Sequence, residues 1–352
     1  MSTQALKAPA RRNCNRTKFR FIRIVLAFAA TSVVSISAFA QDNPDWRKIF
    51  EAAKTEGKVT IYSSQGLKQL NDLAKRFKDT YGIDVQVVRA VETDLWPKVD
   101  VEHQTNKGIA DIMVAAGLGL VIDRNKNGYA VAPVGPAFDN PVYDRKARMA
   151  EGTYFETGAT ILTYSWNTEL WPQGIKDYPD ILNPKLKGLI GVPQARTPGQ
   201  VDFYLYLMRH YGDNFIEKLA ELKPRIYPGA LPQAQAVASG EIAVALHAEP
   251  LVDEKEAGAP VGWGLAPKPF GARFYGMVLK SAPHPNAAQL LANFMITPEG
   301  QEMIARKAGA VLPNIEGSVA STANVPEQDL SKLTPAYVQE FSEKWNALFQ
   351  QQ

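Results

Sequence analysis

Hydroxyl, amide and carboxylate side chains follow two predicted strands near the start of the chain. Ser63, Ser64 and Gln65 follow one strand-forming run, and Glu92 and Thr93 follow the next. Each set stands just before a helical pattern, where free N–H groups at a helix N-terminus can hold an anion. We therefore predict that these five residues bind a small ligand. The alternative is that the hydroxyls only cap helices.

A second polar set lies further along the chain. Arg196, Thr197 and Gln200 open an aromatic helix, and a guanidinium can clamp a carboxylate or phosphonate through two parallel hydrogen bonds. His247 and Glu249 lie at the end of a strand that we predict to be buried. His247 could form hydrogen bonds with ligand oxygens, and Glu249 could pair with a ligand amine or with Arg196. A surface arginine and a structural histidine–carboxylate pair are the alternatives.

Tyr275 is the aromatic residue that we predict to contact the ligand. Side chains alternate along a strand, so Tyr275 and its neighbour Phe274 should point in opposite directions, one into a cleft and one into the core. Trp96 and Trp166 could supply an apolar wall, but aromatic residues at such spacing are more often part of a core.

Three strand–loop–helix units position the first set. Residues 58–62, 83–89 and 110–115 read as strands, each followed by a turn and, after the first two, clearly by a helix. Such a run predicts right-handed parallel crossovers and an open α/β sheet with helices on both faces. Ligands in these sheets bind beyond the carboxyl ends of the strands, which places Ala116 on the same rim as Ser63 and Glu92.

The first forty residues predict export. Seven positive charges and no acidic residue precede an apolar run over residues 24–39, and Ala38-Phe39-Ala40 fits a small-x-small cleavage site. Cleavage after Ala40 would change the formal net charge of the chain from +3 to −4, so nucleic acid is not an expected partner. It would also remove Cys14, the single cysteine, and with it any disulfide or thiolate metal site. We therefore expect a free periplasmic protein.

The C-terminal half carries a strand–turn–helix run over residues 271–295, followed by Thr297-Pro298-Glu299-Gly300-Gln301, in which Thr297 should cap a helix. With residues 110–114, 182–188 and 236–241, this run closely resembles bacterial extracellular solute-binding proteins, more narrowly the ferric-iron and small-anion type that serves ABC importers. The resemblance implies a two-lobed type II periplasmic-binding fold with a hinge and an interlobe cleft. It places the signal peptide at 1–40, the first lobe at 41–130 and 267–352, and the second at 131–266.

The resemblance also implies a small-molecule solute and ABC permease subunits as partners, for a protein that we expect to be a monomer without a cofactor. Our hypothesis is that the solute is a small organic anion or zwitterion: a carboxylate, a phosphonate or a phosphorylated metabolite. A sensory binding protein that feeds a receptor is not distinguished from a transporter component. We expect no enzyme, because no nucleophile elbow, clustered metal motif or phosphate-binding glycine loop is present.

Ferric-ion binding is the alternative within this family. Iron-binding relatives carry adjacent tyrosines where this chain has His247-Ala248-Glu249, and a histidine where it has Gln65-Gly66. Both departures argue against a phenolate iron site. A different set of nitrogen and oxygen ligands, drawn from His247, Glu249, Glu92 and Glu102, stays open.

Overall fold

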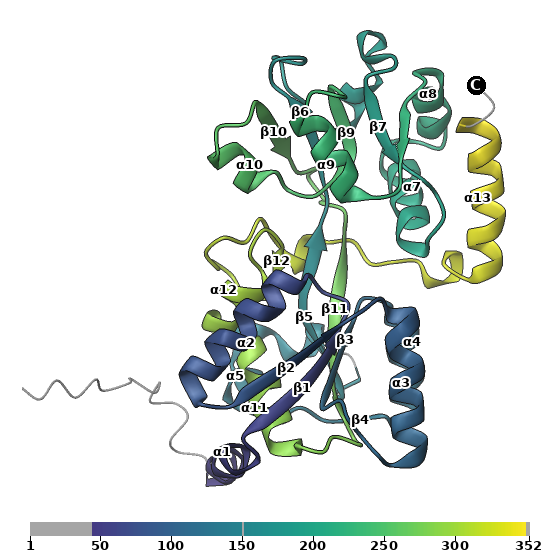
Figure 1. The fold of residues 1–352 in the computed structure, drawn as a ribbon. Helices are drawn as coiled ribbons and strands as arrows, with labels where there is room; N and C mark the ends of the chain where they lie inside the picture. Colours follow the sequence, from purple (N-terminus) through teal and green to yellow (C-terminus); the bar gives the residue numbers. More distant parts are fainter. Residues whose placement is uncertain (1–43, 150, 350–352) are drawn as a thin grey trace, which may run out of the picture. The chain divides into compact units, whose positions relative to one another are not determined.

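Two β-sheets organise the part of the chain that the computed structural model describes, residues 44–149 and 151–349 (Figure 1). The predicted signal peptide lies outside the described residues. The first sheet is built from β1 (Lys58–Ser63), β2 (Asp84–Arg89), β3 (Ile112–Ala115), β4 (Ala130–Val131), β5 (Tyr154–Ile161), β11 (Gly271–Leu279), β12 (Gly309–Ala310) and β13 (Ala320–Ser321). The second contains β6 (Thr163–Asn167), β7 (Ile190–Pro193), β8 (Arg225–Tyr227), β9 (Val244–Ala248) and β10 (Val261–Gly264).

The first sheet has the strand order β13-β12-β5-β11-β3-β1-β2, with β4 paired to β11. β1 pairs in parallel with both β2 and β3, which confirms the three crossover units, and β11 runs antiparallel between β3 and β5. The carboxyl ends of β1, β2 and β3 therefore lie on one edge of the sheet. Those ends carry the first predicted set of polar residues.

Alternation along the strands divides the core of this sheet into two faces. Ile61 and Ile112 pack on one face, while their neighbours Tyr62 and Met113 pack on the other. Apolar residues of α1 (Pro44–Glu56), α2 (Leu67–Tyr81), α11 (Pro285–Met295) and α12 (Pro298–Ile304) cover the first face. Those of α3 (Glu92–Thr105) and α4 (Leu118–Lys126) cover the second (Figure 1).

The second sheet has the order β10-β6-β9-β7-β8, in which β9, β7 and β8 run parallel. Its helices are α7 (Pro198–Tyr211), α8 (Phe215–Glu221), α9 (Ala230–Ala238) and α10 (Val252–Glu256). Aromatic rings fill much of its core, where Phe203, Tyr204 and Tyr178 are almost fully buried. The terminal helix α13 (Pro335–Phe349) adds Trp345 and Phe349 to this core.

Short helices complete the chain between these elements. They are α5 (Pro136–Asp139), η2 (Pro141–Tyr143), α6 (Arg145–Arg148), η3 (Tyr178–Leu182), η4 (Pro184–Leu186), η5 (Thr322–Asn324) and η6 (Leu330–Lys332). Within the described residues, no helix has the length and apolar character that a membrane crossing requires.

The predicted domain boundaries do not follow the two sheets. β5 belongs to the first sheet and is separated from β6 of the second sheet by Leu162 alone, so the chain changes sheets near residue 162 rather than 130. The helix α13, predicted with the first lobe, packs against α7 and α8 of the second sheet. The first difference arises because sheet membership depends on strand pairing between distant residues, and the second because α13 packs its apolar side chains against distant helices; local composition reports neither.

Candidate functional site

The carboxylate of Glu92 lies where the predicted rim loops meet. Its Oε1 accepts hydrogen bonds from the Ser64 hydroxyl at 3.0 Å, from the Ala116 N–H at 2.5 Å and from the Gly117 N–H at 3.3 Å. Its Oε2 accepts from the Gly117 N–H at 3.0 Å. The structure therefore brings together three predicted residues, Ser64, Glu92 and Ala116, at the ends of β1 and β3 and the start of α3.

Local backbone geometry builds this contact. The Ser64 N–H donates to the Val114 carbonyl at 3.2 Å, which ties the loop after β1 to the end of β3. Gly117 caps α4 and has no side chain, and a Cβ there would lie 2.6 Å from Glu92 Oε2. A glycine is thus required for the carboxylate to approach the backbone. Glu92 also stands in the first turn of α3, where negative charge is favourable.

The other predicted residues of this rim differ in exposure. Ser63 is fully buried, and its hydroxyl accepts from the Gln65 N–H at 3.1 Å. Gln65 is also buried, and its Oε1 has no hydrogen-bond partner among the described residues. Thr93 is exposed. Only Gln65 therefore offers a buried, unsatisfied polar atom on this loop.

On the second sheet, Thr197 and Gln200 form a capping box at the start of α7. The Thr197 hydroxyl accepts from the Gln200 N–H, while the Gln200 Oε1 accepts from the N–H groups of Arg196 and Thr197 at 3.1 Å. The Gln200 amide nitrogen donates to the Pro228 carbonyl at 2.9 Å. These side chains are engaged within the chain, whereas the Arg196 guanidinium is exposed and has a hydrogen bond of 3.5 Å to Gln194.

His247 lies in the aromatic core of the second sheet. It is 6% exposed, its ring centroid is 4.7 Å from that of Phe203, and its Nδ1 has no partner among the described residues. Burial lowers the pKa of His247 to about 4, so the imidazole is neutral at neutral pH. Glu249 lies two residues further on and is exposed. Desolvation raises the pKa of its carboxyl, the charge of Lys307 lowers it, and the charge of Glu254 raises it further.

Phe274 and Tyr275 point to opposite faces of the first sheet, as predicted, but each packs against a hydrophobic core, whereas we predicted that one of them would face a cleft. Phe274 belongs to the core under α2 and α11, and Tyr275 packs at the edge of the core under α3 and α4. The Tyr275 ring meets that of Tyr154 edge-on, with 5.9 Å between centroids. Burial, with a smaller contribution from Glu156, raises the pKa of Tyr275 to about 12, so the phenol stays protonated.

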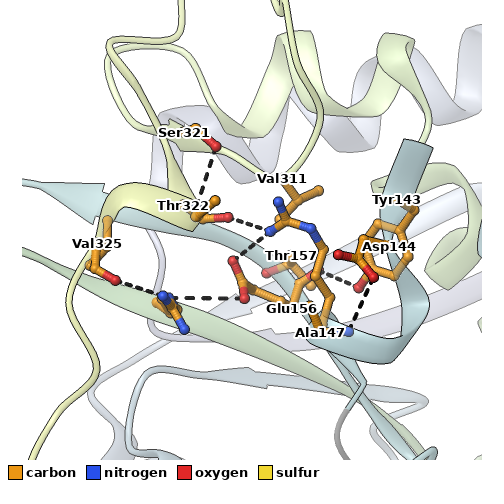
Figure 2. Close-up of polar contacts among 12 residues, drawn as sticks. Tyr143, Asp144, Ala147, Glu156, Thr157, Val311, Ser321, Thr322 and Val325 are labelled. Carbon is orange, nitrogen blue, oxygen red and sulfur yellow. Dashed lines mark hydrogen bonds and ion pairs between the residues drawn. The ribbon is translucent and has the colours of Figure 1, made fainter. Parts of the chain in front are cut away.

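A buried charge cluster surrounds Glu156 on β5 (Figure 2). Arg148 donates to Glu156 Oε1 at 2.9 Å and also to the Thr322 hydroxyl. Arg273 Nε lies 4.0 Å from Glu156 Oε2, and its Nη2 donates to the Val325 carbonyl at 2.6 Å. Two guanidinium groups therefore share one carboxylate, and they connect α6, β5, β11 and the segment that leads towards α13. No sequence motif marks this cluster, because its members are far apart in the chain.

The four side chains considered for a metal site do not form one. Glu102 is buried and accepts from Tyr62 and from the N–H groups of Ile109 and Ala110, a structural role before β3. Glu92 is engaged at the rim, His247 is buried against the Phe203 ring, and Glu249 is exposed. Within residues 44–149 and 151–349, no group of three histidine, cysteine, aspartate or glutamate residues is placed to hold a metal ion.

Two open cavities of about 510 Å³ each are lined by other residues. One lies beside η3 and η4 and includes Trp171 and Asp180. The other lies at the end of α7, where Arg209, His210 and Lys268 face the segment at residues 323–327. None of the twelve predicted site residues lines either cavity.

Comparison with known proteins identifies the family. The sequence model of bacterial extracellular solute-binding proteins matches residues 59–309, which is most of the chain. The chain belongs to the bacterial extracellular solute-binding proteins. Members of this family bind solutes outside the cytoplasm. The two sheets described above are the two lobes of their fold.

Solved structures of other solute-binding proteins share this fold. Iron-bound HitA from Pseudomonas aeruginosa is 19% identical, with a TM-score of 0.61, over 84% of this chain and 98% of that one. AfuA from Actinobacillus pleuropneumoniae, with exogenous fructose-6-phosphate bound, is 21% identical, with a TM-score of 0.62, over 84% and 99%. FutA from Trichodesmium, in complex with iron and citrate, is 17% identical, with a TM-score of 0.58, over 84% and 99%. At these identities the likeness concerns the fold alone.

Proposed function

We propose that this solute-binding protein delivers a small organic anion or zwitterion to an ABC permease. The observation that carries the proposal is the polar rim at the carboxyl ends of β1 and β3. There the Ser64 hydroxyl and the N–H groups of Ala116 and Gly117 converge on a carboxylate, that of Glu92. Such a rim is where open α/β sheets bind ligands, and its donors and acceptor suit a polar solute rather than an apolar one.

Cationic side chains supply the attraction for a negative group. Arg196 follows β7 and is exposed, with a planar guanidinium that can hold a carboxylate or phosphate through two bonds. Lys307 forms an ion pair with Asp253 and also lies near Glu249, which follows β9, so Arg196 is the more available of the two cations. The bound fructose-6-phosphate of AfuA and the citrate of FutA are organic anions held on the same fold, which supports this class of solute.

In this proposal the solute binds between the lobes and touches both of them only when they close. Binding then shifts the population towards the closed form, because that form alone makes the full set of contacts. Charge-assisted hydrogen bonds, stronger where water is excluded, provide most of the affinity. Ser64, Arg196 and Tyr275 are the residues that we expect to contact the solute, with His247 buried behind them and Glu249 exposed after β9.

Titration calorimetry on the purified protein tests the proposal. The panel contains fructose 6-phosphate, citrate, inorganic phosphate, an aminoalkylphosphonate and simple dicarboxylates, with neutral sugars as the negative set. We expect one anionic or zwitterionic class to bind, and Arg196→Ala to weaken it at least about tenfold. Arg225→Ala is the matched control, since Arg225 is an exposed arginine that begins β8, the parallel neighbour of β7, and so lies at the amino ends of these strands rather than at the carboxyl end that Arg196 follows. Binding of neutral sugars alone would overturn the proposal.

Ferric-ion binding is the second candidate, because HitA and FutA carry iron on this fold. The absence of a tyrosine pair at His247-Ala248-Glu249 counts against it. Addition of ferric citrate separates the two candidates: an iron-binding protein should develop a visible absorption band, and a citrate-binding protein should show heat of binding with citrate alone.

Export rests on the predicted signal peptide. We infer that residues 1–40 are removed and that the mature protein acts in the periplasm as a monomer. The mass of protein recovered from a periplasmic extract checks the cleavage site after Ala40. A product that retains residues 1–40 would contradict it.

A further inference from the structure

We propose that Glu92 sets the charge preference of the first-lobe rim by acting as a built-in anion. This inference rests on the proposed function and sharpens it. The rim that would hold the negative group of a solute already holds a carboxylate of the chain itself. The solute should therefore present a hydroxyl or ammonium group to the first lobe and its negative group to another part of the site.

The donors of the rim are used by this one side chain. The Ser64 hydroxyl, the Ala116 N–H and the Gly117 N–H all donate to Glu92, at distances from 2.5 to 3.3 Å. A solute anion on the same donors would stand within a few ångströms of the Glu92 charge. Like charges so close together repel each other strongly enough to exclude a weakly bound anion.

Glu92 is also hard to displace. It is attached to the first turn of α3, so its carboxylate competes as an intramolecular group with a high effective concentration. Its two backbone partners, Ala116 and Gly117, lie at the start of α4, where a negative charge is stabilised by the helix dipole. A free anion must overcome both advantages. The tethered carboxylate therefore remains in place at ordinary solute concentrations.

The same geometry leaves acceptor capacity for a solute. Glu92 Oε2 accepts one hydrogen bond in the described part of the chain, from Gly117, although a carboxylate oxygen has lone pairs for two. The side chain is half-buried rather than enclosed. A hydroxyl or ammonium group can thus donate to Oε2 while the backbone donors stay satisfied.

Inorganic phosphate tests this inference without knowledge of the natural solute. Wild type, Glu92→Ala and Asp94→Ala are titrated with phosphate by calorimetry and thermal shift, at constant ionic strength kept with chloride. Removal of Glu92 frees three converging donors, so Glu92→Ala should bind phosphate at least about tenfold more tightly than wild type. Asp94→Ala removes the same charge from an exposed position in the same helix turn and should behave as wild type.

Two further variants locate the effect. Ser64→Ala in the Glu92→Ala background should lose most of the gained phosphate binding, because it removes one of the three donors. Glu92→Gln keeps an oxygen acceptor for the same donors and should preserve folding. It should bind phosphate more tightly than wild type but less tightly than Glu92→Ala.

Equal phosphate affinity in wild type, Glu92→Ala and Glu92→Gln would overturn the inference. It would also be overturned if the Glu92→Ala, Ser64→Ala double variant bound phosphate as tightly as Glu92→Ala. The phosphate titration tests a different claim from the solute panel. If wild type binds no anionic or zwitterionic solute, the proposed function fails, whereas the phosphate titration still reports what Glu92 does at the rim.

Discussion

The two lobes use polar side chains in different ways. In the first lobe, carboxylates and amides join segments that are far apart in the chain: Asp111 accepts from Thr60 and from His284, and Gln301 bonds Thr157 and Val311. In the second lobe, polar side chains close local turns, as in the capping box at Thr197, and also donate to distant backbone carbonyls, as Asn167 does to Val237 and Thr163 to Ala248. Its core is built largely from aromatic rings, in which Phe203 meets Tyr178 and Phe270 edge-on and Tyr204 packs against Trp345.

This difference predicts how each lobe responds to substitution. A buried charge with distant partners leaves those partners unpaired when it is removed, so the loss is large and electrostatic. An aromatic core loses contact area instead, and its buried histidine makes it sensitive to acid. A local cap supports one helix end and costs little when it is removed.

The largest expected effect comes from Glu156 in the first lobe. Glu156→Ala leaves the guanidinium groups of Arg148 and Arg273, whose side chains are only 11% and 19% exposed, without their carboxylate. Removal of one partner from a buried charge cluster costs about 3–5 kcal/mol. Urea unfolding of the purified protein should show a loss of this size in the free energy of unfolding.

Glu169→Ala is the control for this measurement, because Glu169 is an exposed glutamate of the second lobe and its removal should change the free energy of unfolding by less than about 0.5 kcal/mol. A loss below about 1 kcal/mol for Glu156→Ala would contradict the view that long-range charge contacts stabilise the first lobe.

The sequence predicted what short segments determine by themselves. The strands β1, β2 and β3, the helix from Leu67 and the cap at Thr297 follow from periodicity and helix-start residues, and the structure confirms them. Thr197, which we predicted to bind the ligand, forms a capping box at the start of α7. The opposite directions of Phe274 and Tyr275 are also confirmed.

Contacts between distant segments could not be predicted in the same way. We predicted that Ser64 and Glu92 would lie on one rim. We did not predict that Glu92 would accept the hydrogen bonds of the Ser64 hydroxyl and the Ala116 N–H, because that depends on how closely the loops approach one another. Glu156 and its arginines carry no spacing signal. His247 was expected to line a cleft, yet every residue of β9 is buried, so alternation gives no sign of which side faces solvent.

His247 gives the next largest effect, in the second lobe, and it depends on pH. Above pH 6.5 the imidazole is neutral in both folded and unfolded protein, so it adds no pH dependence. As the pH falls from 6.5, the unfolded chain takes up a proton that the folded chain, with its pKa lowered to about 4, does not. Stability is therefore lost between pH 6.5 and about 4, by roughly 3 kcal/mol in total.

Urea unfolding at pH 7 and pH 4.5 measures this loss, with His247→Gln as the comparison. The variant cannot take up the proton, so its free energy of unfolding should fall by about 2 kcal/mol less than that of wild type over this interval. All other titrating groups are common to both proteins and cancel. Equal pH dependence in the two proteins would show that the imidazole of His247 is not buried in a neutral form.

Thr197→Ala gives the smallest expected effect and decides between a local and a functional role at the start of α7. The Thr197 hydroxyl accepts from the Gln200 N–H, and loss of such a cap typically costs about 1 kcal/mol. If Thr197 only caps α7, thermal unfolding should shift by a few degrees while the affinity for the solute found in the panel stays within about twofold. An affinity loss of tenfold or more, with the melting temperature unchanged, would mean that Thr197 contacts the solute and that the second lobe binds through the same kind of helix start that Glu92 occupies in the first.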